Sequence, residues 1–410
     1  MVFLNLGKHM ARRKFGLAGA IFVAVMMLST VAQAAAGCRN TGSFQQWLAE
    51  FKQEAIAQGI QRNTIRRGLA GVAYNPKIVA RDRRQGVFAQ TFLKFSGRMV
   101  SGHRLKRGAG LIRKYNRIFA DIKQRYGVPA SVIVAFWALE TDFGAFIGDL
   151  PTLHSLATMA YDCRRPDLFR RELLSALRII DRGDLQAHEM VGPWAGELGQ
   201  TQFLPSHYYD YGVDYDGDGR VNLLTSVPDV LASTANYLHH LGWKRNQPWL
   251  QEVRVPASMR WGQASLSIKH SRAQWAKWGV VRANGKALRA DRLQASLLLP
   301  MGRNGPAFLA YKNFDIYLEW NNSLTYCITA GYLATRFSGA RRVGRGRAEV
   351  QSLSLGQTKR LQRLLVRRGY DVGKVDGIIG SKTRDAVKDV QKKFGMPADS
   401  YPTPNLLSKL

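Results

Sequence analysis

The stretch that decides the fold is VIVAFWALETDFG, residues 132–144. Its first eight residues, 132–139, are all apolar, so a helix that carries them has no polar face and must be covered by protein on every side. Glu140 follows this run directly, and Gly144 offers a natural helix end. The pattern predicts a buried helix at the centre of a helical core, with a carboxylate in its last turn.

Glu140 has two interpretations. It is either the first solvated residue after a buried helix, or an acid whose pKa is raised by desolvation until it can donate a proton at neutral pH. The negative end of the helix dipole would also disfavour its anion. Asp142, two residues on, would point away from Glu140 rather than pair with it.

A glycine-rich segment, GPWAGELGQTQFLPSHY (192–208), is the second candidate for a functional site. Glycines allow a backbone to approach a ligand closely. Amide side chains such as Gln200 and Gln202 both donate and accept hydrogen bonds, which suits sugar hydroxyls and N-acetyl groups. The sequence alone leaves a ligand-binding loop and a plain surface turn equally open.

Hydrophobic spacing divides the chain into parts. From residue 43 to about 245 apolar residues recur at helical spacing, and residues 44–60 and 109–128 each read as one amphipathic helix. Beyond Trp249, short alternating segments predict small strands and long loops. These segments are residues 252–256, 296–300 and 308–320, after which residues 323–338 return to a helix.

The C-terminal part is predicted to be a separate unit. Residues 338–350 are polar, basic and glycine-containing, which is typical of a linker. In residues 351–410, two helical stretches flank the loop GKVDGIIGSKT. Leu361, Leu364 and Leu365 share one face of the first helix, so this face is expected to be core.

The N-terminus resembles a secretory signal peptide. A basic head, a short apolar run and a small-residue A-x-A ending occupy residues 1–36. The apolar run is short for a membrane anchor, and a retained helix is the alternative. Export permits disulfides, so Cys38 is predicted to pair with Cys163. Lipid attachment at Cys38 and free thiols are the alternatives.

The charge is strongly basic, with 60 Lys and Arg against 29 Asp and Glu, a net charge of +31. In a cytosolic protein this balance would indicate nucleic-acid binding. For an exported protein the expected polyanions are cell-wall polymers, lipopolysaccharide and anionic lipid surfaces. The basic residues are scattered along the sequence, which favours loose electrostatic adhesion over one specific binding surface.

Several separated motifs together resemble the membrane-bound lytic murein transglycosylase B family. They are WALETDFG, LPTLHSLATMAYDCRR, PWAGELGQTQFLPSHY, DYDGDGR and SVPDVLASTANYL, in this order over residues 40–337. The resemblance implies a mainly α (α+β) fold, with a lysozyme-like helical core and a small β part. Residues 351–410 resemble the three-helix peptidoglycan-binding domain of wall hydrolases. The expected organisation is a signal peptide (1–36), a catalytic domain (37–337), a linker (338–350) and a binding domain (351–410).

The resemblance also implies roles for individual residues. Glu140 takes the place of the family's single catalytic acid/base. Pro193 stands where some relatives have serine, and Asp315 where some have tyrosine, which leaves the details of the sugar subsites open. The residues expected to bind substrate are Tyr115, Trp194, Gln202, Tyr237, Trp320 and Asn321.

The implied reaction cleaves the MurNAc–GlcNAc β-1,4 bond of peptidoglycan and leaves 1,6-anhydro-MurNAc ends. One carboxyl group suffices because the muramic acid's own 6-hydroxyl attacks, whereas ordinary glycoside hydrolysis uses two carboxyl groups. A lysozyme-type muramidase and a non-catalytic wall-binding protein are the alternatives. The expected partners are glycan strands and other cell-wall enzymes, with no nucleic acid and a membrane only after lipidation of Cys38. The expected location is the periplasm.

The acidic segment DYDGDGR predicts a calcium loop. Oxygen ligands at alternate positions, with a glycine at the sixth, fit the first half of an oxygen-rich Ca²⁺ loop. Thr225 stands where glutamate is usual, and Asp229 could close the site. The expected ligands are Asp214, Asp216, Asp218, the Arg220 carbonyl and Asp229. The ion would be structural, no cofactor is needed for the chemistry, and a metal-free acidic turn is the alternative.

Overall fold

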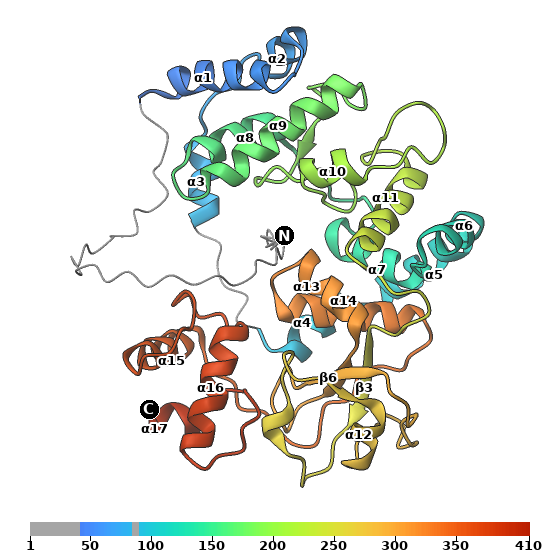
Figure 1. Ribbon diagram of the computed structural model, residues 1–410, viewed down its shortest axis with the longest axis vertical. Helices are drawn as coiled ribbons and strands as arrows, with labels where there is room; N and C mark the ends of the chain where they lie inside the picture. The colour runs from blue at the N-terminus through green and yellow to red at the C-terminus, as the bar shows by residue number, and fades with distance from the viewer. Residues whose placement is uncertain (1–41, 84–89) are drawn as a thin grey trace, which may run out of the picture.

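The computed structural model describes residues 42–83 and 90–410 (Figure 1). The predicted signal peptide, residues 1–36, and Cys38 lie outside these residues. The described chain is mainly helical, as predicted, with one antiparallel sheet of five strands and another of two. None of the described helices combines the length and the apolar character that crossing a membrane requires.

Helix α7 (Ala130–Thr141) is the centre of the helical core. Every residue from 131 to 141 is buried, because the helix has no polar face to offer to solvent. Helices α5 (Gly102–Lys114), α11 (Val227–His240) and α14 (Leu324–Phe337) pack against it. Figure 1 shows α7 enclosed by elements that are far apart in sequence. Each fully buried Val, Ile, Leu or Phe side chain contributes roughly 1.5–3 kcal/mol to such a core.

The other helices surround this centre. Helices α8 and α9 pack closely on each other; α2 contacts α9, and α1 and α3 contact α8 (Figure 1). Their bounds are α1 (Phe44–Ala57), α2 (Arg62–Gly68), α3 (Pro76–Arg83), α4 (Phe92–Met99), α6 (Asn116–Tyr126), α8 (Thr152–Tyr161), α9 (Pro166–Arg182), α10 (Pro205–Tyr211) and α13 (Lys312–Trp320). A two-stranded sheet of β1 (Leu150–Pro151) and β2 (Val191–Gly192) joins the segment after α7 to the glycine-rich segment.

The β part has its own small core. Its five strands run in the order β4-β6-β7-β3-β5, with all neighbours antiparallel. Trp275, on the short helix α12 (Arg272–Lys277), is buried there and donates from Nε1 to the Ala295 carbonyl at 2.9 Å. The strands are β3 (Leu250–Arg254), β4 (His270–Ser271), β5 (Val281–Arg282), β6 (Gln294–Leu298) and β7 (Ala307–Ala310), with a 3₁₀ turn at Trp261–Gln263.

The C-terminal unit has three helices, as predicted: α15 (Leu355–Arg367), α16 (Ser381–Lys393) and α17 (Pro404–Lys409). Its core contains Leu361 and Leu365, both fully buried. The unit docks on the β part, because Arg384 donates to the carbonyls of Leu299 and Pro300 at 3.2 and 2.9 Å.

Two sequence predictions about elements were wrong. Residues 109–128 form two helices rather than one, because the backbone leaves helical geometry at Tyr115 (φ −102°, ψ 26°). Residues 308–320 contain only the end of a strand, β7, followed by helix α13. Phe314, Tyr317 and Trp320 are three residues apart, which is helical spacing, and all three are buried.

The cysteines agree with the sequence prediction as far as the described residues go. Cys163 is disulfide-bonded, whereas its predicted partner, Cys38, lies outside the described residues. Cys327 is a free, buried thiol that donates to the Tyr317 and Asn321 carbonyls. It is therefore part of the core behind α13.

Candidate functional site

Glu140 lies in the last turn of α7 and is 8% exposed. Two buried donors hold its Oε1 atom. Trp320 Nε1, from the end of α13, donates at 2.9 Å, and the Tyr326 hydroxyl, from α14, donates at 2.5 Å. Three separate elements therefore fix the position of this carboxyl group, so it is not a solvated residue at a helix end.

The environment of Glu140 favours its neutral form. Burial raises the pKa of Glu140, and the hydrogen bonds from Tyr326 and Trp320 oppose this rise because they stabilise the anion. The apolar side chains of residues 132–139 on the same helix are buried, so little water can solvate a charge at its end. Such a carboxyl group can act as a proton donor near neutral pH.

A second buried carboxyl group, Glu197, lies in the glycine-rich segment. The pKa of Glu197 is raised to about 7, chiefly by burial and also by the charge of Glu140, while Arg165 acts in the opposite direction. Sequence reasoning missed this residue. Its only signal was a glutamate between Gly196 and Leu198 in an otherwise uncharged run.

The chain after α7 holds a strained turn. Asp142 (φ 52°), Phe143 (φ 62°) and Gly144 (φ 82°) are all left-handed, and each of the first two costs on the order of 1 kcal/mol. Arg104 fixes Asp142 through a hydrogen bond of 2.9 Å from Nε, and Arg107 adds an ion pair at 3.6 Å. Asp142 thus turns away from Glu140, as predicted, and its partners are arginines of α5.

Gln200 connects the glycine-rich segment to α7. Its Oε1 accepts from Trp137 Nε1 at 2.9 Å, and its backbone carbonyl accepts from the Thr141 hydroxyl. A Cβ at Gly144 would lie 2.4 Å from Gln200 Oε1, so only glycine fits there. Gln200 therefore positions the segment beside Glu140 and is committed to structural contacts.

The glycines of this segment approach the protein itself rather than open space for a ligand. A Cβ at Gly192 would lie 2.0 Å from the Glu197 carbonyl, and one at Gly199 would lie 2.6 Å from the Leu223 carbonyl. A Cβ at Gly196 would meet the Leu156 side chain at 2.3 Å. The glycines are needed for close approach of the backbone, as expected. However, the backbone approaches other parts of the protein and not a ligand.

Of the predicted substrate residues, Trp320 contacts Glu140 directly and Tyr237 packs against Trp320, while Gln202 is held by carbonyls of nearby segments. The Tyr237 ring, on α11, lies 5.6 Å from the ring of Trp320, which itself donates to Glu140. Gln202 has a left-handed backbone (φ 54°) and donates from Nε2 to the Gly199 and Ile147 carbonyls at 2.9 and 3.3 Å. Tyr237 and Gln202 are 6% and 7% exposed.

The other three predicted substrate residues lie differently. The Tyr115 ring is half-buried, with its centroid 6.5 Å from that of Trp137. Trp194 is half-buried in the glycine-rich segment. Asn321 is fully buried; its Oδ1 accepts from the Ser323 backbone at 2.8 Å, and its Nδ2 has no partner among the described residues. No surface of Asn321 is open to a substrate in this structure.

Tyr326 is the other residue that the sequence analysis missed. It sits in the apolar segment SLTYCITAGYL and reads there as a core residue. A signal existed, because a buried tyrosine hydroxyl needs a hydrogen-bond partner. Nothing in the sequence indicated that this partner is a carboxylate 186 positions away.

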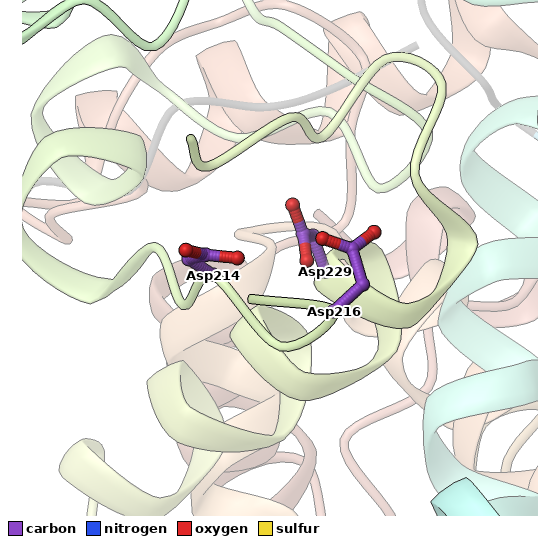
Figure 2. Close-up of side chains that lie close together, drawn as sticks. All are labelled: Asp214, Asp216 and Asp229. Atoms are coloured by element: carbon purple, nitrogen blue, oxygen red, sulfur yellow. The ribbon is translucent and has the colours of Figure 1, made fainter. Parts of the chain in front are cut away.

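The acidic loop brings together three of its four predicted carboxylates. Oxygen atoms of Asp214, Asp216 and Asp229 lie within 4.8 Å of one another (Figure 2). Asp218 is not in this group, and its Oδ1 accepts from the Arg220 backbone N–H at 2.9 Å. The Arg220 side chain extends to the Asp184 carbonyl. Close carboxylates of this kind suit a hard cation such as Ca²⁺.

Comparison with known proteins supplies the family. Residues 43–335 match the model of the transglycosylase SLT domain, and residues 355–410 match that of a putative peptidoglycan-binding domain. Membrane-bound lytic murein transglycosylase B of Escherichia coli (strain K12) is 29% identical over 257 residues, which are 61% of this chain and 68% of that protein.

Two solved structures are similar over most of the chain. SltB3 from Pseudomonas aeruginosa, in complex with NAG-anhNAM-pentapeptide, is 43% identical with a TM-score of 0.84, covering 90% of this chain and 99% of that one. The Escherichia coli lytic transglycosylase Slt35, in complex with calcium, is 25% identical with a TM-score of 0.61, covering 72% of this chain and 93% of that one.

The family match spans the buried acid, the glycine-rich segment and the acidic loop. The chain therefore belongs to the transglycosylase SLT domain family and carries a C-terminal peptidoglycan-binding domain.

Proposed function

We propose that this protein is a lytic transglycosylase that cleaves the MurNAc–GlcNAc β-1,4 bond of peptidoglycan and leaves 1,6-anhydro-MurNAc ends. The observation that carries the proposal is the buried, hydrogen-bonded carboxyl group of Glu140. Family membership supports the same reaction, as do the peptidoglycan fragments in the SltB3 complexes, NAG-anhNAM-pentapeptide and NAG-NAM-pentapeptide.

Glu140 performs both proton transfers. Its two donors meet at Oε1, which leaves Oε2 to carry the acidic proton. That proton passes to the glycosidic oxygen as the bond to C1 of the muramic acid breaks. The muramic acid 6-hydroxyl then attacks C1, and the Glu140 carboxylate accepts the proton of that hydroxyl. The acid is restored and no water is consumed, so the reaction needs no cofactor.

The sugar binds against the residues that surround this carboxyl group. Tyr237 and Trp320 provide aromatic surface, and Gln202 provides an amide. Tyr115 and Trp194 are half-buried, and we assign to them contacts with sugars further along the strand. Asn321 shapes the end of α13 and positions Trp320, since its side chain is buried away from solvent.

The C-terminal domain and the N-terminal segment place the enzyme at its substrate. Residues 351–410 anchor the catalytic domain (37–337) to peptidoglycan, which raises the local concentration of glycan strands. A peptidoglycan substrate places the protein outside the cytoplasm. We assign it to the periplasm, because residues 1–36 have the pattern of a signal peptide.

A calcium ion bound to the acidic loop supports the fold. Asp214, Asp216 and Asp229 are the ligands that the geometry favours, with Asp218 and the Arg220 carbonyl completing the predicted set. The calcium complex of Slt35 supports this assignment. The ion would neutralise three close carboxylates between α10 and α11, and it takes no part in the proton transfers.

Mass analysis of the products tests the proposal. Purified sacculi are digested with the wild type, with Glu140→Gln and with Glu50→Gln, a matched change at an exposed glutamate of α1. The wild type and Glu50→Gln should release anhydro-ended muropeptides, and Glu140→Gln should be slower by about 10²–10⁴-fold. Reducing ends in place of anhydro ends would indicate a muramidase. Equal inactivity of all three would indicate a wall-binding protein without catalysis.

A further inference from the structure

Six arginines from four separate segments of the sequence line one cavity of about 980 Å³ in the β part. This arginine cavity lies between the sheet and the connection that follows α14. Its floor includes Leu250 and Phe308, on β3 and β7. The arginines are Arg254, Arg282, Arg303, Arg341, Arg342 and Arg347. The sequence analysis expected scattered charge, and here the fold gathers it.

The six charges are not neutralised by the protein. Within residues 42–83 and 90–410, no carboxylate forms a salt bridge with any of them. The only acidic residue lining the cavity is Glu252, whose Oε1 accepts from the Gly344 backbone at 2.8 Å. Burial lowers the pKa of Arg347, and the nearby positive charge of Arg303 acts in the same direction.

The connection of residues 338–350 is held against the sheet. Its Val343 N–H donates to the Tyr332 hydroxyl at 3.0 Å, and its Arg347 N–H donates to the Asn304 carbonyl at 2.8 Å. At Gly346 (φ 93°) a Cβ would lie 2.1 Å from the same carbonyl, so the close approach requires glycine. The three arginines of the connection that line the cavity are therefore presented from an anchored backbone, which reduces the entropy lost on binding.

We propose that the arginine cavity binds a phosphoryl-bearing anion with at least two phosphoryl groups. Six arginines and one glutamate leave five uncompensated positive charges. A phosphoryl group carries about −1.5 to −2 at neutral pH, so two of them offset about three to four of these charges, whereas one carboxylate supplies a single charge. The planar guanidinium fork also matches phosphate oxygens in bidentate geometry. This binding is separate from the proposed glycan cleavage.

Such an anion has two sources in a cell envelope: the headgroup of a phosphorylated lipid, or a free or polymer-borne phosphate. Two probes distinguish them. Inorganic pyrophosphate, measured by calorimetry at low salt, represents the phosphate alone. Phosphatidylcholine vesicles with and without phosphatidylinositol bisphosphate, measured by sedimentation, represent the lipid surface. Binding to pyrophosphate with no gain from the bisphosphate lipid assigns the site to non-lipid phosphate, and binding to both assigns it to a lipid headgroup.

Matched variants locate the binding. Arg341→Gln, Arg342→Gln and Arg347→Gln are combined in one full-length variant. Arg62→Gln, Arg66→Gln and Arg67→Gln, all exposed on the distant helix α2, are combined in a control with the same charge (Figure 1). The first variant should bind pyrophosphate at least tenfold more weakly, because it loses three of the six guanidinium groups that would hold the phosphate oxygens. The control should change less than twofold.

A second variant, Arg254→Gln with Arg303→Gln, tests the same cavity without altering the connection. Retained digestion of sacculi shows that each variant is folded. Equal weakening in the cavity variants and the α2 control would overturn the proposal, and so would a wild type that binds neither probe. Equally tight binding of citrate, which offers only carboxylates as charged groups, would overturn the assignment to phosphoryl groups.

Discussion

Glu140 and the arginine cavity are charged sites built in opposite ways. Glu140 is 8% exposed, sits at the end of an apolar helix and is held by two donors from other helices. The six arginines are exposed, lie around an open cavity and have no carboxylate partner among the described residues. At the first site desolvation controls protonation. At the second, water keeps every group charged, and a ligand must supply the opposite charge.

The difference indicates which perturbations each site should respond to. Interactions between exposed charges are screened at an ionic strength of 0.1 M beyond about 10 Å, whereas buried groups are screened much less. Added salt should therefore weaken anion binding at the arginine cavity and leave the pH dependence of catalysis nearly unchanged. Substitutions that change core packing should affect catalysis by Glu140 strongly and anion binding at the arginine cavity only weakly.

Among the buried groups, Glu197 should have the largest effect on how the free energy of unfolding depends on pH. Its pKa is about 7 in the folded protein, against an ordinary value of 4.5. A carboxyl group with a raised pKa contributes its full stability when the pH is below the ordinary pKa of 4.5. This contribution is lost as the pH rises through about 7. The loss amounts to about 3 kcal/mol by pH 8. Glu197→Gln stays neutral, so it should become more stable relative to the wild type by about this amount between pH 5 and pH 8.

Urea unfolding of both proteins at pH 5 and pH 8 measures this difference directly. Glu50→Gln, at an exposed residue, serves as the control and should show no such change. If the stability of Glu197→Gln relative to the wild type is the same at both pH values, Glu197 does not titrate in a dry environment.

In its burial the acidic loop is intermediate between Glu140 and the arginine cavity, since Asp214 and Asp216 are exposed and Asp229 is buried. Calcium that binds only the folded protein adds about 2.7 kcal/mol of stability at a hundredfold excess over Kd. Thermal melts of the chelator-treated protein, with and without added CaCl₂, should therefore differ by several degrees.

Two asparagine variants identify the calcium ligands. Asp216→Asn should lose most of the gain from calcium, because Asp216 belongs to the close group. Asp218→Asn should lose less, since Asp218 stands outside that group and binds the Arg220 backbone. Identical wild-type melts with and without calcium would favour a metal-free acidic turn.

Tyr326→Phe has the smallest expected effect on activity, and it tests how hydrogen bonding sets the pKa of Glu140. The Tyr326 hydrogen bond lowers the pKa of Glu140, so its removal should raise that pKa further. The high-pH limb of the kcat/KM profile should then move to higher pH, with a loss of about tenfold in rate from poorer positioning. Tyr332→Phe provides a control, because the Tyr332 hydroxyl accepts from the Val343 N–H of the connection, whereas the donors to Glu140 are Trp320 and Tyr326.

A purely structural role for Tyr326 would lower activity equally at every pH. A shift of the high-pH limb in the opposite direction would contradict the assigned hydrogen bond.

The sequence predicted those parts of the site that depend on local pattern. The apolar run of residues 132–139 predicted a buried helix that ends near Glu140, because a helix without a polar face must be covered on every side. The separated motifs gave the family and the three-helix C-terminal domain, which the comparisons confirmed. The spacing of the acidic loop predicted a calcium site, and three of its carboxylates lie close together.

What the sequence could not predict depends on contacts between distant segments. Tyr326 reaches Glu140 from 186 positions away, and Glu197 is buried only because the glycine-rich segment folds against α8. Residues 308–320 were misjudged because a short strand and a helix share one apolar stretch. The arginine cavity is assembled from β3, β5, one loop and the connection, so its charge is scattered in the sequence.

The most direct test is the protonation state of Glu140 itself. Infrared spectra are recorded from pH 4 to pH 9 for Glu197→Gln and for Glu197→Gln combined with Glu140→Gln, so that the difference contains one carboxyl group. The account predicts a protonated carbonyl band that persists well above pH 4.5, the ordinary value for glutamate. A band that disappears at or below pH 4.5 would show an ordinary solvated carboxylate and would contradict the account.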